Sequence, residues 1–126
     1  MHKIILMFWL LIASTSAQAA WALVTSNEEA AIYADISSLS KSGDIVKMWD
    51  ISDFRQKVAG VNYSSVKSQR EYDCKGKQNR TLSYSSMSKN MAGGLVVKSS
   101  NFARPWSPVY SGGIVAALWN TACAKR

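Results

Sequence analysis

Two cysteines, Cys74 and Cys123, have the most definite chemistry in this chain of 126 residues. In an oxidising compartment an even number of cysteines predicts a disulfide, and with only two the pairing is Cys74 with Cys123. Such a bridge closes a loop of roughly 50 residues, for which the chain-entropy model gives ~4 kcal/mol of stabilisation. The alternatives are a redox-active thiol pair, which is usually closely spaced, and a zinc site, which would need further ligands. We predict the structural disulfide, with no metal and no cofactor.

Basic residues cluster around the first cysteine and at the end of the sequence. The proposed bridge would bring the second group beside the first, so that six cations gather at one end of the molecule. Such a cluster could bind sulfated glycans, lipid phosphates or acidic protein segments, with strong salt dependence. The alternative is a solvated hairpin turn beside a charged terminus. The predicted polyanion-binding residues are Arg70, Lys75, Lys77, Arg80, Lys125 and Arg126.

Catalytic constellations are weak in this sequence. The single histidine, His2, lies within the predicted signal peptide described below, which removes histidine-based acid–base and triad catalysis from the exported chain. Serine–lysine spacings occur at the frequency expected by chance. The carboxylates Asp50 and Asp53 are interpreted as turn or capping acids at a strand end. We therefore predict that the protein is not an enzyme and has no catalytic residues.

The N-terminal segment is typical of a secretory signal peptide. A short positive start at Lys3 is followed by an apolar run from Ile4 to Ala13 and by Ala17-Gln18-Ala19, the small-residue pattern that signal peptidase recognises. We expect cleavage after Ala19, so that residues 1–19 are the signal peptide and residues 20–126 form one domain. The apolar run is too short to span a bilayer, and no cysteine at the cut suggests a lipid anchor. The expected location is the periplasm, the cell surface or the medium.

The formal net charge of +7 predicts weak attraction to polyanions in general. Nucleic acid is not an expected partner, because an exported protein rarely meets it and the aromatic residues are not interleaved with arginine as a stacking platform requires. Aromatic residues suggest a second candidate surface, which would act as a dimer or partner interface if one sheet face is uncovered. These residues are Trp49 with Phe54, and Trp106 with Tyr110.

Hydrophobic patterning predicts short strands over most of the domain. The clearest run is 66–74, where Lys67, Gln69, Glu71 and Asp73 form a polar side that indicates one wet sheet face. Turn signals at 41–44, 75–79 and 92–94 separate the runs and favour an antiparallel meander. The other predicted strands are 21–25, 31–35, 45–51, 81–86 and 95–99.

Residues 113–124 change to a helical period. Ile114, Val115, Leu118, Trp119 and Ala122 fall on one stripe, which predicts an amphipathic helix. Two features would stabilise its ends: Ser111 as the N-cap, and Lys125-Arg126 beside the negative end of the helix dipole. The predicted fold class is α+β, an antiparallel sheet of about six strands with a C-terminal helix tied to it by one disulfide.

Short motifs in a fixed order resemble the bacterial surface-adhesin protein E family. The matching features are Trp21, Tyr33-Ala34-Asp35-Ile36-Ser37-Ser38-Leu39, Lys47-Met48-Trp49, Ser65-Val66-Lys67, Glu71-Tyr72-Asp73-Cys74, Arg80, Leu82, Tyr84-Ser85, Gly93-Gly94, Trp106, Ser111 and Cys123. The resemblance covers the whole chain after the signal peptide and implies the same fold. It also implies an adhesin that binds host matrix and serum proteins such as vitronectin and laminin.

The expected function is therefore that of an exported, non-enzymatic binding protein whose partner is a host matrix protein or a sulfated glycan. No host-binding residue of the family can be matched to a position in this sequence. The alternative is a periplasmic protein-interaction or envelope-maintenance protein with no adhesin activity.

Overall fold

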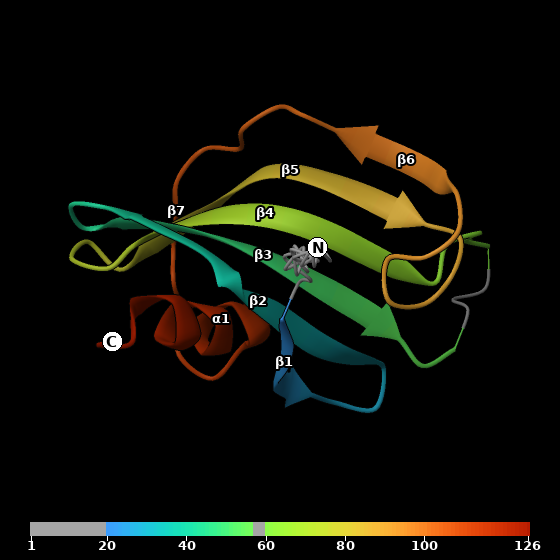
Figure 1. Cartoon of the computed structure of the whole chain (residues 1–126), viewed down its shortest axis with the longest axis horizontal. Helices are drawn as coiled ribbons and strands as arrows, with labels where there is room; N and C mark the ends of the chain where they lie inside the picture. Colours follow the sequence, from blue (N-terminus) through green and yellow to red (C-terminus); the bar gives the residue numbers. More distant parts are fainter. Residues whose placement is uncertain (1–19, 57–59) are drawn as a thin grey trace, which may run out of the picture.

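The computed structural model describes residues 20–56 and 60–126, so the predicted signal peptide lies outside the described residues. Within them the chain forms one antiparallel sheet and one α-helix, as the sequence predicted (Figure 1). The elements are β1 (Trp21–Ser26), β2 (Ala30–Ser42), β3 (Ile45–Phe54), β4 (Ser65–Asp73), β5 (Gln78–Met87), β6 (Val96–Ser100), β7 (Ser107–Pro108) and α1 (Ile114–Cys123).

The strands form a meander in which β1 to β6 lie side by side in sequence order. Short connections explain this order, because a tight turn joins a strand most easily to an antiparallel neighbour. The prediction of six strands is confirmed, and the two-residue β7, which pairs with β5, is an addition. Strand β2 is longer than predicted, because it continues after an irregularity between Asp35 and Ser40.

Two hairpin turns meet at one end of the sheet. Gly43, with a φ of 59°, occupies the turn between β2 and β3, in the left-handed region that glycine adopts without strain. Between β4 and β5 the carboxylate of Asp73 accepts the backbone N–H groups of Lys75 and Gly76, at 3.1 and 2.8 Å. This arrangement is a turn stabilised by an aspartate side chain. The backbone N–H of Cys74 donates to the Asp44 carbonyl at 2.9 Å and joins the two turns.

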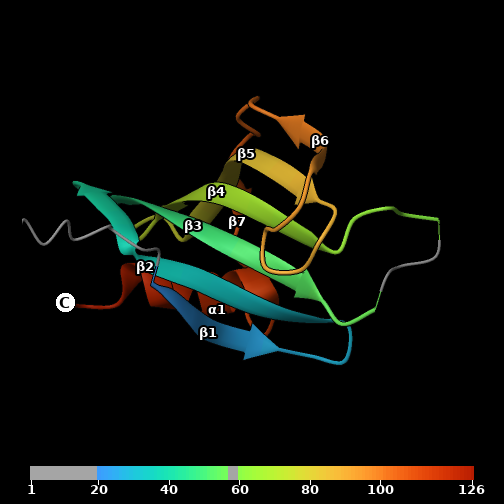
Figure 2. The same cartoon turned by 45° about the vertical axis from the view of Figure 1, so that its right-hand side comes forward.

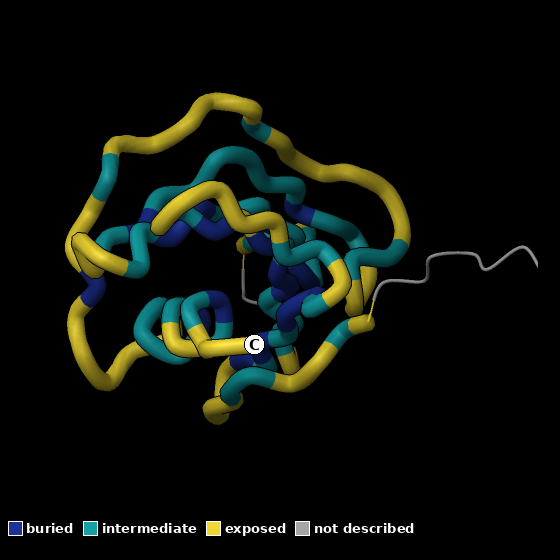
Figure 3. Tube along the Cα trace, turned by 60° about the vertical axis from the view of Figure 1, so that its left-hand side comes forward, coloured by how far each residue is buried: buried dark blue, intermediate teal, exposed yellow. Residues whose placement is uncertain are grey.

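The core lies between α1 and one face of the sheet, called here the inner face. Leu118 and Ala122 of α1 are buried against Ile32, Met48 and Tyr72, which lie on β2, β3 and β4. Figure 2 shows α1 behind β1 and β2, and Figure 3 shows the buried positions concentrated between helix and sheet. Removal of these apolar side chains from water is the main force that holds α1 in place.

The helix begins and ends close to the predicted residues, but its N-cap differs. Gly113, not Ser111, is the N-cap residue, and no side chain accepts a hydrogen bond there. The prediction of Ser111 as the cap is wrong because Gly112 and Gly113 intervene between this serine and the first helical residue. At the other end Nη1 of Arg126 donates to the carbonyl oxygens of Thr121 and Ala124, at 2.8 and 3.4 Å. A cation therefore does lie beside the last helical carbonyls, as predicted.

The other face of the sheet, the outer face, is less wet than the sequence suggested. Ile51 of β3 is completely buried there, and Glu71 is only 7% exposed. The Lys67 ammonium lies between two indole rings, 4.9 Å from the centre of Trp49 and 6.0 Å from that of Trp21. The prediction of a uniformly solvated face is therefore wrong, because side chains from neighbouring strands cover part of it. In the described part of the chain no helix is long and apolar enough to cross a bilayer.

Candidate binding site at the basic end of the sheet

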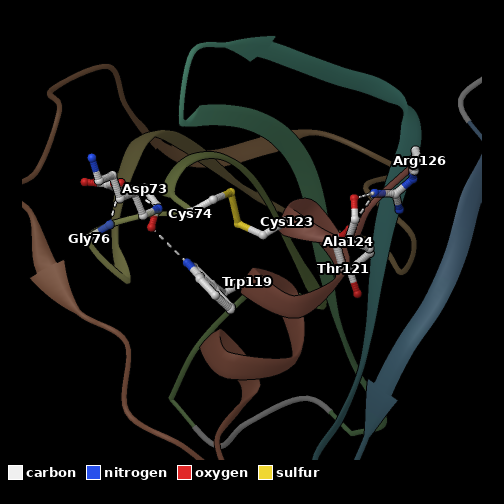
Figure 4. Close-up of a disulfide and its surroundings, with 9 residues drawn as sticks. Asp73, Cys74, Gly76, Trp119, Thr121, Cys123, Ala124 and Arg126 are labelled. Carbon is white, nitrogen blue, oxygen red and sulfur yellow. Dashed lines mark hydrogen bonds between the residues drawn. A yellow bond between two sulfur atoms is a disulfide. The ribbon is translucent and has the colours of Figure 1, made fainter.

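The predicted disulfide joins the end of β4 to the end of α1. Cys74 and Cys123 are bonded, with their Cα atoms 5.6 Å apart (Figure 4). The Trp119 indole N–H also donates to the Asp73 carbonyl at 3.0 Å, which fixes the last turns of α1 against the same strand end. These two links bring the β4–β5 turn and the C-terminal residues to opposite sides of the bridge.

Lys75 and Lys77 project from the β4–β5 turn and are both exposed. The Lys77 ammonium lies 5.9 Å from the centre of the Trp119 ring, at the outer limit of a cation–π contact. Because Asp73 orders the backbone of this turn, the two lysines extend from a defined base rather than from a loose loop.

Lys125 and Arg126 lie on the other side of the disulfide and are also exposed. The helix-end carbonyls hold Nη1 of Arg126, whereas its remaining guanidinium N–H groups make no hydrogen bond to the described residues. An arginine fixed in this way retains donors for a ligand anion. Four of the six predicted cations thus flank the bridge, in two pairs.

Arg70 does not belong to this cluster, and its prediction as a free cation is wrong. Its Nε donates to Oδ2 of Asp50 at 2.8 Å on the inner face, and its Nη1 donates to Thr81. Asp50 lies in the middle of β3 and is fully buried, so its interpretation as a capping acid at a strand end is also wrong. Asp53 does act in this way, since it accepts hydrogen bonds from the Asn90 side chain and the Met91 backbone.

Burial determines the protonation behaviour of this ion pair. It raises the pKa of the Asp50 carboxyl from 3.8 to about 6, and the charge of Arg70 limits the rise. Burial alone would lower the pKa of Arg70, but the charge of Asp50, the nearby Tyr72 and the hydrogen bond to Asp50 together outweigh burial, and the net direction is upward. The pKa of Tyr72 is also raised, by burial and by the nearby Asp50 charge. Asp50 and Tyr72 are completely buried and Arg70 is paired with Asp50, so we interpret the group as structural.

Arg80 is only partly available to a ligand. Its Nε and Nη2 both donate to Oε1 of Glu71, at 2.8 and 2.6 Å, and its guanidinium lies 4.7 Å from the centre of the Trp106 ring. Glu71 therefore neutralises Arg80, and Trp106 covers one side of it. The ion pairs within the described residues are this one and Arg70–Asp50.

Sequence reasoning missed Lys41, which the fold adds to the basic end. The β2–β3 hairpin places it beside Lys125 and Arg126, where the three line one groove. The turn signal at 41–44 indicated that Lys41 is exposed. Its position next to α1 follows from the irregularity in β2, which the sequence did not reveal.

The predicted aromatic surface does not form a single patch. Phe54 packs against Tyr63 with ring centres 5.9 Å apart, and Trp49 contacts Lys67. Trp106 is half-buried over Arg80, whereas Tyr110 is 77% exposed. These aromatic residues lie in separate places, and all except Tyr110 are partly buried against neighbouring side chains. Among the described residues no group of three potential ligands could hold a metal ion.

The antiparallel meander with a helix tied across one face by a disulfide defines a small exported-type α+β domain. A family model described as surface-adhesin protein E matches residues 21–124, and the chain belongs to this family. The crystal structure of protein E from non-typeable Haemophilus influenzae has a similar fold. Its TM-score is 0.52 at 13% sequence identity, and the match covers 86% of this chain and 76% of that one. No curated protein sequence matches the chain significantly.

Proposed function

We propose that this chain is an exported, non-enzymatic adhesin domain that binds sulfated glycans of the host matrix. Membership of the surface-adhesin protein E family supports an adhesin-like role. The binding residues of the proposal are Lys75, Lys77, Lys125 and Arg126.

One observation supports this site more than any other. The four cations are exposed on either side of the disulfide, whereas the ion pairs found in the described chain involve Arg70 and Arg80. Exposed charge pairs are individually weak, at roughly 0–1 kcal/mol, so useful affinity requires several at once. A sulfated glycan supplies a repeating row of anions that can contact both pairs, and salt must weaken such binding.

Retention on immobilised heparin tests the proposal. The double variant Lys75→Gln/Lys77→Gln should elute at clearly lower salt than the wild type. The matched control is Lys89→Gln/Lys98→Gln, which removes the same charge from exposed positions on the loop after β5 and on β6. This control should elute close to the wild type. Equal losses of retention in the two variants would show that only net charge matters and would contradict a defined site.

The proposed location is tested separately, by protease treatment of intact and osmotically opened cells. Digestion in intact cells supports the adhesin role. Protection until the outer membrane is opened would instead favour the periplasmic interaction protein and would leave the cationic site without access to host glycans.

A further inference from the structure

A groove of about 440 Å³ lies between the β2–β3 hairpin and the C-terminal end of α1. The hairpin contributes Lys41 and the apolar residues Leu39 and Val46 to one wall. The C-terminal end of α1 and the residues after it form the opposite wall. In Figure 4 the hairpin passes beside Arg126, close to the last turn of α1. The lining residues are Leu39, Lys41, Val46, Ala122, Cys123, Ala124, Lys125 and Arg126.

The groove combines an apolar floor with a cationic rim. Val46 and Ala122 are buried core residues at the bottom of the groove, and the partly exposed Leu39 packs against the core beside them. Lys41, Lys125 and Arg126 supply three positive charges, and none of the residues that line this groove in the described chain is acidic. The helix carbonyls position Arg126, so that one rim cation is already ordered before a ligand binds.

We propose that this groove binds one molecule of a single-chain anionic lipid. The phosphate would lie among Lys41, Lys125 and Arg126, and the first methylenes of the acyl chain would cover Leu39 and Val46. Charge complementarity selects the anion, and the apolar floor selects a ligand whose anion carries a hydrocarbon chain. A sulfated glycan offers the charge but no hydrocarbon chain, so the floor distinguishes this ligand from the one proposed above.

The expected affinities follow from these two contributions. Each methylene that leaves water contributes roughly a fourfold gain in affinity, so a few of them exceed tenfold. Loss of one exposed rim charge should weaken binding up to about fivefold. Both the anionic headgroup and the acyl chain of the ligand are therefore needed for full affinity.

Titration calorimetry with three probes below their micelle concentrations, and with a hexaglutamate peptide as the acidic-peptide control, tests the proposal. Lysophosphatidic acid carries both parts, glycerol 3-phosphate carries only the anion, and lysophosphatidylcholine carries the chain with a zwitterionic headgroup. We expect lysophosphatidic acid to bind at least about tenfold more tightly than either of the others. Equal binding of glycerol 3-phosphate, of lysophosphatidylcholine or of a hexaglutamate peptide would overturn the assignment, as would no binding of lysophosphatidic acid.

Two variants locate the binding. Ala124→Trp adds volume at an exposed lining residue outside the core and should abolish lysophosphatidic acid binding, and Lys41→Gln should weaken it. The control Lys98→Gln, on β6, should bind as the wild type does. Unchanged binding by folded Ala124→Trp would place the lipid elsewhere and overturn the proposal. Ala124→Trp should also keep the heparin retention that Lys75 and Lys77 provide, so failure of the groove and failure of the glycan site are distinguishable.

Discussion

Asp50 and Arg70 form an ion pair in which the carboxylate is completely removed from water. Asp50 has no exposed side-chain surface, and Arg70 retains 20%. Removal of one partner from a buried pair costs about 3–5 kcal/mol. In Asp50→Ala the Arg70 guanidinium loses the hydrogen-bond acceptor that the carboxyl provides in either protonation state. Asp50→Ala should therefore reduce the free energy of unfolding by about this amount in urea titrations. Asp44→Ala, at an exposed turn residue, is the control and should stay within about 0.5 kcal/mol of the wild type.

A cost below about 1 kcal/mol for Asp50→Ala would contradict this account of the pair. It would mean that Arg70 reaches water easily once its partner is gone.

The same carboxyl predicts how stability depends on pH. Its pKa is about 6 in the folded chain and roughly 3.9 when unfolded, so the folded state binds the proton more tightly. Protonation of Asp50 therefore adds stability as the pH falls below about 7, by about 1 kcal/mol at pH 5. Urea unfolding between pH 7.5 and 5 should show this gain, and the gain should be absent in Asp50→Asn. An identical pH profile for the two proteins would contradict the raised pKa.

At the scale of elements, the disulfide adds to the packing that holds α1 on the sheet. Without Cys74–Cys123 the helix keeps the burial of Leu118 and the hydrogen bond from Trp119 to Asp73. Cys74→Ser/Cys123→Ser should lose about 2–5 kcal/mol of stability, the usual cost in a small exported domain. Hydrogen exchange should then increase in α1 more than in β3. Equal thermal midpoints with and without reductant in the wild type would contradict a stabilising role for the bridge.

Patterns within single elements were sufficient to predict the meander and the helix, and the cysteine count with the expected export was sufficient to predict the disulfide. Apart from the helix N-cap, what failed depended on contacts between elements. The strand pattern already placed Arg70 on the side of Tyr72, but its partner Asp50 is 20 residues away and becomes its neighbour only through the β3–β4 register. Lys41 reaches the groove only because β2 continues after its irregularity and pairs Lys41 with Val46. Neither pairing has a local sequence signal.

At the scale of the whole molecule, the predicted export step would strengthen a hydrogen bond that the precursor already makes. The backbone nitrogen of Ala20 lies 3.1 Å from Oδ1 of Asp35, a carboxylate that is only 8% exposed. Cleavage after Ala19 would convert this nitrogen from an amide to an ammonium group. A charge-assisted hydrogen bond is roughly twice as strong as a neutral one, so processing should stabilise the domain.

A chain that starts at Ala20 should therefore be about 1 kcal/mol more stable than one with a short N-terminal extension. Urea unfolding at pH 7 measures the difference, and mass spectrometry of the exported protein establishes where it begins. The difference should disappear in Asp35→Asn. Equal stability of the extended and unextended wild-type chains would contradict the predicted ion pair.

The most direct test of the central claim is a ¹H–¹⁵N NMR titration of the ¹⁵N-labelled domain with a heparin hexasaccharide at two salt concentrations. We predict that the largest shifts fall on the amides of 75–77 and 124–126, on both sides of the disulfide, and that higher salt weakens them. Shifts concentrated on β1 or β6, or spread evenly over all lysines, would show that the basic end of the sheet is not the glycan-binding site.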